Sequence, residues 1–421
     1  MSTQQEVSFK PYFKIATAAS FLMGSAAIIF SALSFFVEPV TSYFGFSRTA
    51  FTLTFTITSL IQVLSMPIIG RALERFSLKR IFLVSGATSS VGLIGYSFSS
   101  SIISFYLFSL LIGILVPAFT ALGSVVLINR WFVKKKGTVL GISGSFTGVF
   151  GAIFSLIIPN FIEQFGFQAA YLFLGITLIT IVSLTVIFLV DNSPESVGLI
   201  AYGANDDDQQ SKHSIGETPS IRYRDAIKSP VFFMLYIGFI LITFIGAFQQ
   251  HLPAFFGETG LPSDQVGTLF SLLMIALIFA KIIAGALNDR LGPLMTIMIH
   301  ISSAIVAFIL LITSTSYLMM ILMVILYSFG LSIMNVLLPL LSHEVFGPRD
   351  YSQIWSLLAT GITVGVGVGT PLWGMIYDLT GAYTIGLYGM IFILLTVMTL
   401  FNLAYFKSKK LKQSNQHTQH V

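Results

Sequence analysis

The sequence predicts an all-α membrane protein with twelve transmembrane helices in two pseudo-symmetric six-helix bundles. Three observations support this prediction. Apolar residues make up 55% of the chain and charged residues only 9%, whereas a soluble globular domain carries about a quarter charged residues. Apolar runs of about 20 residues, the length that crosses the hydrocarbon core as a helix, recur along the chain. The two halves of the chain also repeat several motifs at a nearly constant offset.

Composition excludes several classes of site. The 421-residue chain has no cysteine, which excludes disulfides and thiolate metal sites, and its six histidines show no metal-ligand spacing. No glycine loop of the Walker type is present, so ATP is not the expected energy source. The basic residues are dispersed over short loops, which argues against nucleic acid as a partner. We therefore expect no catalytic site, no cofactor and no metal.

The spans follow from the apolar runs in chain order. Residues 1–14 are polar, and the apolar run after them exceeds the roughly 7–15 residues of a signal-peptide core, so we expect it to be retained as a span. The expected spans are 15–37, 49–70, 81–99, 103–129, 138–160, 168–190, 231–252, 264–287, 294–313, 317–341, 353–376 and 383–405.

The basic residues predict the orientation, because lysine and arginine favour cytoplasmic loops. With both termini in the cytoplasm, Arg48 alone among the 22 lysines and arginines falls in an outer loop, and Lys281 alone lies within a span. The reverse orientation would place nearly all of them outside. The sequence thus predicts a multi-pass protein of the plasma or inner membrane, surrounded by lipid and functional as a monomer.

One long hydrophilic segment divides the spans six and six. It contains an acidic run, Asp206-Asp207-Asp208, followed by Arg222-Tyr223-Arg224, and is predicted to be a solvated linker. The expected domains are a cytoplasmic N-terminus at 1–14, a first bundle at 15–190, the linker at 191–230, a second bundle at 231–406 and a cytoplasmic tail at 407–421.

An internal repeat indicates that the two bundles are homologous. Motifs of the first half recur 215 to 217 positions later, namely Gly70-x-x-x-Glu74-Arg75 as Gly285-x-x-x-Asp289-Arg290, Gly144 and Gly148 as Gly361 and Gly365, and Glu163-x-x-Gly166 as Asp378-x-x-Gly381. The glycines predict tightly packed helix faces, since helices in lipid associate through small residues. Pure packing and a gating role are both open for them.

These motifs resemble the major facilitator superfamily over the whole chain. The loop motif of that family, Gly-x-x-x-Asp-Arg-x-Gly, is matched by Gly285, Asp289, Arg290 and Gly292, and less fully by Gly70, Glu74, Arg75 and Ser77. The resemblance implies the major facilitator fold and alternating access. It also implies conformational gating by Gly70, Glu74, Arg75, Gly285, Asp289 and Arg290, because an acid at a helix end can pair with arginine or with a helix N-terminus. The alternative is a topogenic charge cluster that does not switch.

Three stretches are similar to the monocarboxylate porter and oxalate/formate antiporter group of this superfamily. They are the basic Trp-Phe stretch Arg130-Trp131-Phe132-Val133-Lys134-Lys135-Lys136-Gly137, the end of the eleventh span from Gly369 to Asp378, and Lys281 four residues before Gly285. At the position of Lys281 the group typically has a substrate-coordinating arginine. The eleventh span lacks the second cation of the oxalate/formate pattern, which favours a monoanion over a dianion.

Lys281 is the most informative single residue. A cation within a span costs about 2.5–3.5 kcal/mol on insertion scales, and such residues usually mark an ion or substrate path. At 1.5 Å per residue, its Cα lies about 12 Å inside the helix end at Asp289. Its ammonium could replace the hydration of a carboxylate, and a buried lysine can also lose its proton and couple transport to it. The alternatives are a lysine that reaches toward the cytoplasm or pairs with Asp289.

Supporting residues have two interpretations each. Tyr327 and Asn335 could bind a carboxylate or hydroxyl, or form an interhelical polar pair. His251 and Glu258 could relay protons, or form an exposed loop pair. Glu38 falls where several monocarboxylate porters carry a lysine involved in proton binding, so the coupling mechanism of those porters does not transfer directly.

The sequence therefore predicts a secondary active transporter of a small organic anion, most simply a proton-coupled monocarboxylate symporter. An anion exchanger or an efflux carrier of another substrate is the alternative. A transporter-like sensor that binds ligand without net flux is an alternative of a different class.

Overall fold

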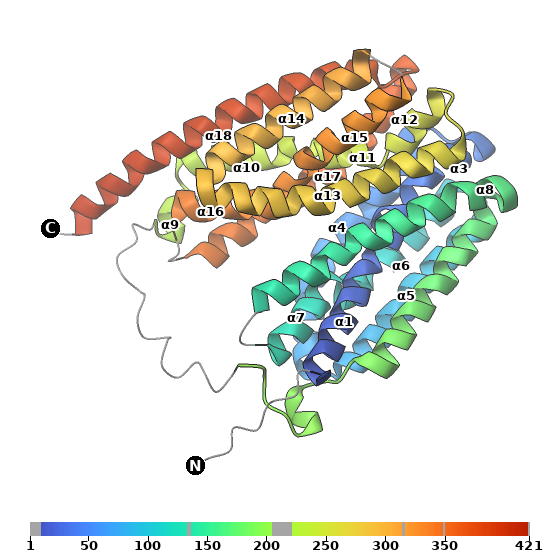
Figure 1. Cartoon of the computed structure of the whole chain (residues 1–421), viewed down its shortest axis with the longest axis horizontal. Coiled ribbons are helices and arrows are strands. Elements are labelled where there is room, and N and C mark those ends of the chain that lie inside the picture. The colour runs from blue at the N-terminus through green and yellow to red at the C-terminus, as the bar shows by residue number, and fades with distance from the viewer. Residues whose placement is uncertain (1–9, 133–135, 204–220, 314–315, 348–349, 420–421) are drawn as a thin grey trace. The chain divides into compact units, whose positions relative to one another are not determined.

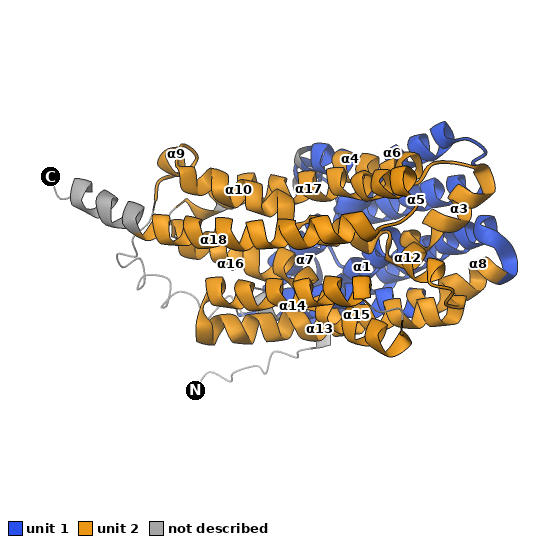
Figure 2. Cartoon of the chain, turned by 90° about the horizontal axis from the view of Figure 1, so that it is seen from above, with its two compact units in different colours: residues 1–32, 61–154, 164–214 blue, residues 33–60, 155–163, 215–421 orange. Residues whose placement is uncertain are grey.

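The fold is described from a computed structural model that covers residues 10–132, 136–203, 221–313, 316–347 and 350–419. Contacts between Cα atoms divide it into two compact units, which are coloured separately in Figure 2. Unit 1 comprises Met1–Ala32, Ile61–Phe154 and Gln164–Ser214, and unit 2 comprises Leu33–Leu60, Ser155–Glu163 and Ile215–Val421. Two short segments that precede the linker, 33–60 and 155–163, therefore belong to unit 2.

Unit 1 is helical throughout its membrane-length segments (Figure 1). Neighbouring helices in the chain pack on each other, since α5 contacts α6, and α7 contacts both α1 and α6. The elements are α1 (Lys10–Gly24), α2 (Ala26–Phe30), the second part of α4 (Arg48–Arg75), α5 (Leu78–Ser97), α6 (Ile102–Phe119), α7 (Ala121–Trp131), most of α8 (Lys136–Leu189) and a short 3₁₀ helix η2 (Pro194–Val197).

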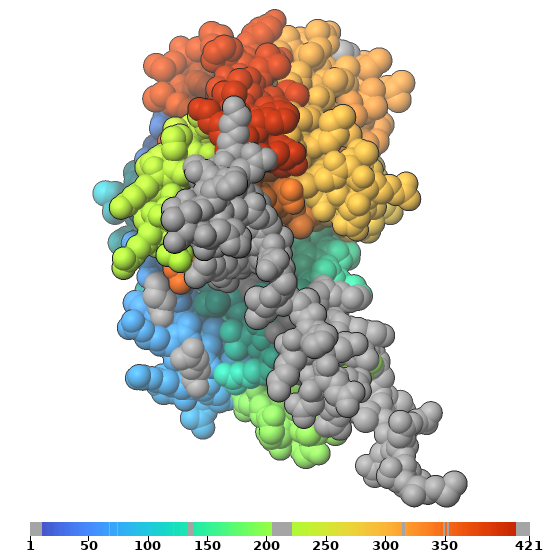
Figure 3. Space-filling view, turned by 90° about the vertical axis from the view of Figure 1, so that its left-hand side faces the viewer, coloured from blue at the N-terminus to red at the C-terminus, as the bar shows by residue number. Residues whose placement is uncertain are grey.

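Unit 2 contains the remaining elements, and its helices pack on one another, with α15 against both α13 and α14 and α10 against α18. They are η1 (Ala32–Phe36), α3 (Val37–Phe44), the first part of α4, α9 (Tyr223–Ala226), α10 (Pro230–Ile242), α11 (Phe244–Gln249), α12 (Leu252–Glu258), α13 (Ser263–Leu291), α14 (Pro293–Thr313), α15 (Tyr317–Ser332), the π-helical turn η4 (Ile333–Leu337), α16 (Leu338–Phe346), α17 (Tyr351–Thr380) and α18 (Thr384–Gln419). Helix α14 packs against α13 and α18, which lie beside it on the surface seen in Figure 3.

Twelve membrane-length segments are present in the described part of the chain, as the sequence predicts. Ten helical stretches are long and apolar enough to cross a bilayer. One of them, Val139–Leu189, contains Gly166 at φ +80°, a left-handed conformation that ends one helix and starts another, so it makes two spans. The twenty-residue helix α5 supplies the twelfth. Large apolar side chains such as Ile68 and Phe392 are more than two thirds exposed, as expected for lipid-facing positions.

Local signals set the helix ends. Ser101 accepts a hydrogen bond from the backbone N–H of Ser104 and caps α6, and Ser229 caps α10 in the same way ahead of Pro230. Gly45 and Gly381, at φ +68° and +71°, end α3 and α17 in the left-handed conformation. Gly166 and Gly381 occupy equivalent positions of the repeat and both have a positive φ, but their ψ angles differ, at 162° and 4°.

The described start of the linker is bound to unit 1, although the sequence predicts a solvated segment. Asp191 forms ion pairs with Lys14 at 3.0 Å and with Lys79 at 3.3 Å. Arg130 donates to the carbonyl of Leu73 at 2.6 Å and to that of Asn192 at 3.4 Å. The first residues of the linker are therefore held by unit 1, because the basic Trp-Phe stretch supplies donors to their backbone, while residues 195–198 are exposed. The solvated linker stays a prediction. The acidic run 206–208 lies outside the described residues.

Candidate functional site

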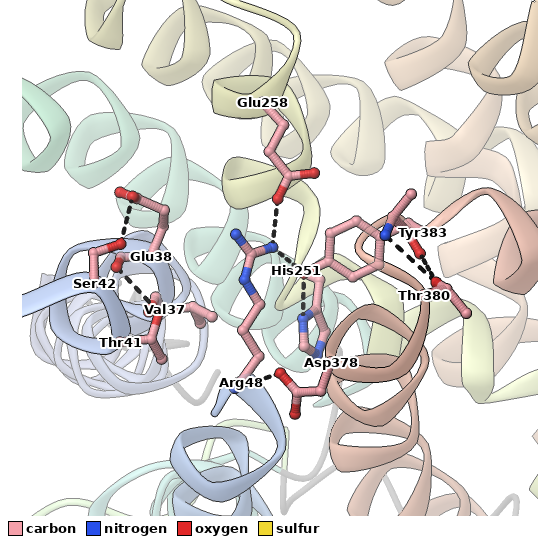
Figure 4. A network of polar contacts seen from close by, with 11 residues as sticks. Val37, Glu38, Thr41, Ser42, Arg48, His251, Glu258, Asp378, Thr380 and Tyr383 are labelled. Carbon is pink, nitrogen blue, oxygen red and sulfur yellow. Dashed lines mark hydrogen bonds and ion pairs between the residues drawn. The ribbon is translucent and has the colours of Figure 1, made fainter. Parts of the chain in front are cut away.

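Arg48, the first residue of α4, is the centre of a polar network at one end of unit 2 (Figure 4). Its guanidinium forms an ion pair with Glu258 of α12 at 2.7 Å and donates to the hydroxyl of Tyr383 at 2.7 Å. It also lies over the ring of Tyr377, 3.6 Å from the centroid. The side chain is 9% exposed. The desolvated cation is thus balanced by a carboxylate, a hydroxyl and an aromatic face.

Asp378 holds the backbone at the start of α4. Its carboxylate accepts hydrogen bonds from the N–H groups of Arg48 and Thr49, each at 2.9 Å, and from the Thr49 hydroxyl. These N–H groups have no partner within their own helix, and a negative charge is favourable at a helix N-terminus. Asp378 therefore caps α4 from a position 330 residues away in the chain. Its carboxylate also offsets the unfavourable placement of a cation in the first turn.

His251, between α11 and α12, is fully buried and uses both ring nitrogens. Nε2 lies 2.8 Å from the carbonyl oxygen of Thr370, and Nδ1 lies 3.0 Å from the hydroxyl of Tyr383. A carbonyl can only accept, so Nε2 bears the proton and Nδ1 of the neutral ring accepts from Tyr383. The Tyr383 oxygen then remains free to accept from Arg48. The expectation of an exposed loop position for His251 is wrong, because the chain folds into two short helices around it.

We call Arg48, His251, Glu258, Asp378 and Tyr383 the Arg48 network. Its hydrogen bonds run in one direction, from the guanidinium to the tyrosine oxygen, from the tyrosine hydroxyl to Nδ1, and from Nε2 to a backbone carbonyl. Aromatic rings surround the hydroxyl, with the centroids of Phe248 and Phe255 about 6 Å from that of Tyr383. The hydroxyl of Tyr383 and the imidazole of His251 are therefore shielded from water, and both have their hydrogen-bond partners.

A cavity of about 610 Å³ lies next to the Arg48 network in unit 2. Three carboxylates, from Glu38, Glu163 and Glu258, line it with Arg48. Glu38 is exposed and accepts a hydrogen bond from Ser42 at 2.9 Å, one turn further along α3. Carboxylates outnumber the guanidinium three to one among these lining groups, so the local field favours protons and other cations over anions.

Close backbone contact joins α4 to α17 beside the network. A Cβ built on Gly374 would lie 2.8 Å from the backbone nitrogen of Thr49 and 2.9 Å from the carbonyl carbon of Arg48. About two turns further on, the Thr56 hydroxyl donates to the carbonyl of Gly367. The first turn of α4 can lie this close to α17 only because position 374 is glycine.

The repeated glycines differ between the two halves. In α17, a Cβ on Gly361, Gly365 or Gly369 would meet α10 or α11 within 3.3 Å, so the expected tight packing is confirmed there. A Cβ on Gly144, the counterpart of Gly361, would meet nothing within 4 Å. Gly144 thus makes no close helix contact, unlike its counterpart Gly361.

Lys281 lies on α13 with its side chain half-buried. Among the described residues, no hydrogen bond or ion pair joins its ammonium to another group, and Asp289, two turns away, is exposed. Gly285 follows one turn later on the same helix face, and a Cβ there would meet nothing within 4 Å. Open space therefore exists at Gly285 on the helix that carries Lys281, and the pairing with Asp289 is not formed.

The two residues expected to assist Lys281 lie in different surroundings. Tyr327 is fully buried and its hydroxyl donates to the carbonyl of Ile245 on α11, which corresponds to the interhelical alternative. Asn335 is exposed within the π-helical turn η4. Such turns are rare and are frequent at functional sites.

The two copies of the loop motif occupy the same place on their helices. Gly70 and Arg75 lie in the last turns of α4, and Gly285, Asp289 and Arg290 in those of α13. Arg75, Asp289 and Arg290 are exposed, and within the described part of the chain none of them forms an ion pair. The side chain of Glu74 lies outside the described residues. The gating role of this motif stays a prediction.

Sequence reasoning finds part of the Arg48 network. Arg48 is the only basic residue of a predicted outer loop, and Asp378 belongs to the repeat, but the two signals do not show that these residues meet. Nothing in the sequence points to Tyr383 as the bridge between Arg48 and His251. A break in the apolar run after Gln249 is the one signal for the unusual backbone around His251.

A family model decides the identity of the chain. The model described as Major Facilitator Superfamily matches residues 18–262 and 252–420. The chain belongs to the major facilitator superfamily. Family and fold are those of multi-pass membrane transporters, and the resemblance recognised from the loop motifs is confirmed.

Curated relatives of this superfamily member are distant. An MFS-type transporter of Gibberella moniliformis is 26% identical over 56% of this chain, and the match spans about half, 53%, of that relative. Monocarboxylate transporter 2 of Homo sapiens is 23% identical over 86% of this chain and 80% of its own length. Monocarboxylate transporter 4 of Rattus norvegicus is 23% identical over 80% of this chain and 71% of its own length.

Solved structures share the fold of this superfamily member. The nucleoside transporter NupG aligns with a TM-score of 0.72 at 12% identity, over 94% of this chain and 99% of that protein. A bacterial homologue of the human lysosomal transporter Spinster, in an inward-facing and unoccupied conformation, aligns with a TM-score of 0.71 at 16% identity, over 96% and 98% of the two chains. At these identities the likeness establishes the fold alone.

Proposed function

We propose that this transporter is a secondary carrier of a small monocarboxylate, coupled to protons, with Lys281 as the cation that binds the carboxylate. The observation behind the proposal is the half-buried Lys281, whose ammonium has no carboxylate partner among the described residues, together with the open space at Gly285 one turn further along α13. An uncompensated cation at membrane depth is costly and is retained where it serves an ion or substrate. The distant relatives named monocarboxylate transporters support the same substrate class.

The proposed cycle is rocking alternating access, in which the site opens to one side of the membrane at a time. A carboxylate entering from water loses hydration, and the ammonium replaces part of it as a point charge. Asn335 is the proposed source of an additional hydrogen bond to the substrate. One buried cation fits one negative charge, so the proposal favours monocarboxylates over dicarboxylates. Lys281, Glu38 and His251 are the proposed candidates for the coupled proton.

The proposed membrane is the plasma or inner membrane, with both termini in the cytoplasm and the monomer as the working unit. The Arg48 network then lies on the outer side. Uptake of labelled lactate, pyruvate and formate into proteoliposomes, with and without an inward proton gradient, tests the function. We expect uptake that the gradient accelerates.

The substitution Lys281→Ala tests the site. Loss of a charge-assisted hydrogen bond worth about 1.5–3 kcal/mol predicts at least a tenfold fall in uptake. Lys281→Arg should retain much of the activity, since the related group has arginine at this position. Lys228→Ala, which removes an exposed lysine outside the spans, is the matched control. Equal transport by wild type and Lys281→Ala would exclude the anion site. Counterflow without gradient dependence would indicate an exchanger, and binding without flux a sensor.

A further inference from the structure

His251 accepts a hydrogen bond at the only ring nitrogen that can take a proton. Its Nε2 already bears hydrogen, because it faces the carbonyl of Thr370. A proton can therefore be added only at Nδ1, where Tyr383 now donates. Protonation at this atom would make both ring nitrogens donors, and the hydroxyl of Tyr383 would lose its acceptor.

The second consequence concerns Arg48. After protonation, the oxygen of Tyr383 would face two cationic donors, the imidazolium and the guanidinium, which each lie within 3.0 Å of it in the present arrangement. The charged and titratable groups around this point are Arg48 of α4, Glu258 of α12, Tyr377 and Asp378 of α17, and Tyr383 before α18. Glu258 already pairs with Arg48, and Asp378 already caps α4. Neither carboxylate is left to balance a second buried cation, so like charges would repel.

We propose that His251 is the proton-binding group of the transport cycle, and that its protonation releases the N-terminus of α4 from α12 and α17. This proposal rests on the proton coupling of the proposed function and names the group responsible. The imidazolium displaces Arg48 from Tyr383, and the ion pair with Glu258 turns toward the cavity, where both side chains meet water. Opening in turn hydrates the imidazolium, so the open arrangement binds the proton more tightly, and acid favours opening.

The other candidates are less suited to this role. Glu38 is exposed, and its recorded partner is the hydroxyl of Ser42 on its own helix, so protonation there changes no contact between helices. Lys281 forms no ion pair with another described residue, so a change in its protonation would break no ion pair between helices. Of the three, only His251 is bonded to other segments of the chain, to Thr370 of α17 and to Tyr383 before α18.

The proton has a short route. Arg48 and Glu258 line the cavity, and Tyr383 bridges Arg48 to His251. Tyr383 is buried and does not line the cavity, so water reaches its oxygen when the Arg48 side chain swings aside; as a proton from that water arrives, the hydroxyl proton moves to Nδ1, which leaves a neutral tyrosine and an imidazolium. The reverse steps return the proton to water, and no other reactant is needed.

A cysteine reporter tests the proposal, because the natural chain has no cysteine. Thr52 is fully buried and lies on α4 between Thr49 and Thr56, which both contact α17. Thr52→Cys should therefore react with a maleimide only when α4 leaves α17. Ser42→Cys, at an exposed cavity position, serves as the reference, since its rate corrects for the change in thiolate with pH. No substrate is added, so the result does not depend on the identity of the transported anion.

We expect the labelling rate of Thr52→Cys, divided by that of Ser42→Cys, to rise about tenfold between pH 8 and pH 5.5. His251→Gln in this background should leave the ratio flat, because the glutamine amide can make both hydrogen bonds but does not titrate. His300→Gln is the matched control, since His300 is equally buried in unit 2 but bonds to Thr296 of its own helix. It should behave as the parent does.

Tyr383→Phe keeps the test decisive if His251→Gln fails to fold. Removing the hydroxyl disconnects Arg48 from His251 while the aromatic packing remains, so labelling should be faster at both pH values and insensitive to pH. A pH response that persists in folded His251→Gln or Tyr383→Phe would overturn the proposal. A flat ratio in the parent would overturn it as well. If the pH response depends on His251 but no monocarboxylate is taken up, the switch stands and the proposed substrate fails.

Discussion

Replacing Arg48 by methionine should release α4 and shift the transporter strongly toward the open arrangement. Methionine keeps most of the volume of the side chain but removes three interactions, namely the ion pair with Glu258, the hydrogen bond to Tyr383 and the contact over Tyr377. The first two are charge-assisted hydrogen bonds worth about 1.5–3 kcal/mol each, and the third adds about 0.5–2 kcal/mol.

The net effect is smaller than the sum, because the wild type also desolvates the guanidinium. Glu258 is 31% exposed and can regain water when Arg48 is lost, which limits its cost. Breaking a buried pair costs about 3–5 kcal/mol, and the partial exposure places this case at the lower end, near 3 kcal/mol. At 1.4 kcal/mol for each factor of ten, the closed arrangement should lose about a hundredfold in population relative to the open one.

The assay is maleimide labelling of Thr52→Cys at pH 8, where the parent is expected to be closed. We expect Arg48→Met to raise the rate by up to about a hundredfold. Arg48→Lys should give a smaller rise, because an ammonium keeps the charge but lacks the planar face and fork of the guanidinium. Arg71→Met is the control, since Arg71 is exposed near the other end of the same helix. A rate for Arg48→Met within twofold of the parent would refute the assignment of Arg48 as the group that holds α4.

Two further predictions concern packing and charge elsewhere. Gly365→Ala should lower the free energy of unfolding by about 1–3 kcal/mol, because its Cβ would collide with Thr243 and with the backbone of Ile240. Gly144→Ala should be neutral or slightly stabilising, because a Cβ there meets no other group. Thermal unfolding of the purified proteins measures both variants, and equal losses of stability would contradict the packing difference. Burial alone would raise the pKa of the Asp191 carboxyl, but the hydrogen bonds and charges of its two lysine partners outweigh burial and hold that pKa below its ordinary value. The stabilisation is therefore present above the unfolded pKa and is lost as the pH falls through the folded pKa. Asp191→Asn should cost about 0.5–1 kcal/mol at pH 7, and a difference from the wild type that does not shrink as the pH is lowered would contradict this account.

The fold could be predicted from the sequence because its signals are local. A run of about 20 apolar residues is a span wherever it occurs, and a glycine such as Gly166 or Gly381 marks a helix end by its own backbone freedom. The predicted spans 81–99 and 294–313 correspond closely to α5 and α14 for this reason. The first span extends further than expected, through α2, η1 and α3 to Phe44, since the apolar run continues beyond the point where a single straight helix would end.

The site could be predicted only in part, because its residues are distant in the chain. Arg48 stands out in the sequence as an isolated outer cation and Asp378 as a residue of the repeat. No local sequence pattern indicates that they are in contact, because they are 330 positions apart. The apolar run in the sequence predicts His251 at the end of a regular span, 231–252. The structure breaks that span into α10, α11 and α12, which turns the imidazole inward onto Thr370 and Tyr383.

The repeat indicates how the two halves came to differ in chemistry. At the offset of 215 positions, Lys281 corresponds to Met66 and His251 to Phe36, so the first half has apolar residues where the second has the two proposed functional groups. Gly166 and Gly381 both end a helix with a positive φ, while the acids before them have different roles, since Glu163 lines the cavity and Asp378 caps α4. Both proposed binding groups therefore lie in unit 2, joined by α12 and α13, which pack on each other. Proton and anion can then be coupled if the segment from His251 through Glu258 to Lys281 has two conformations. The proton at His251 and the anion at Lys281 would each shift the equilibrium between these two conformations.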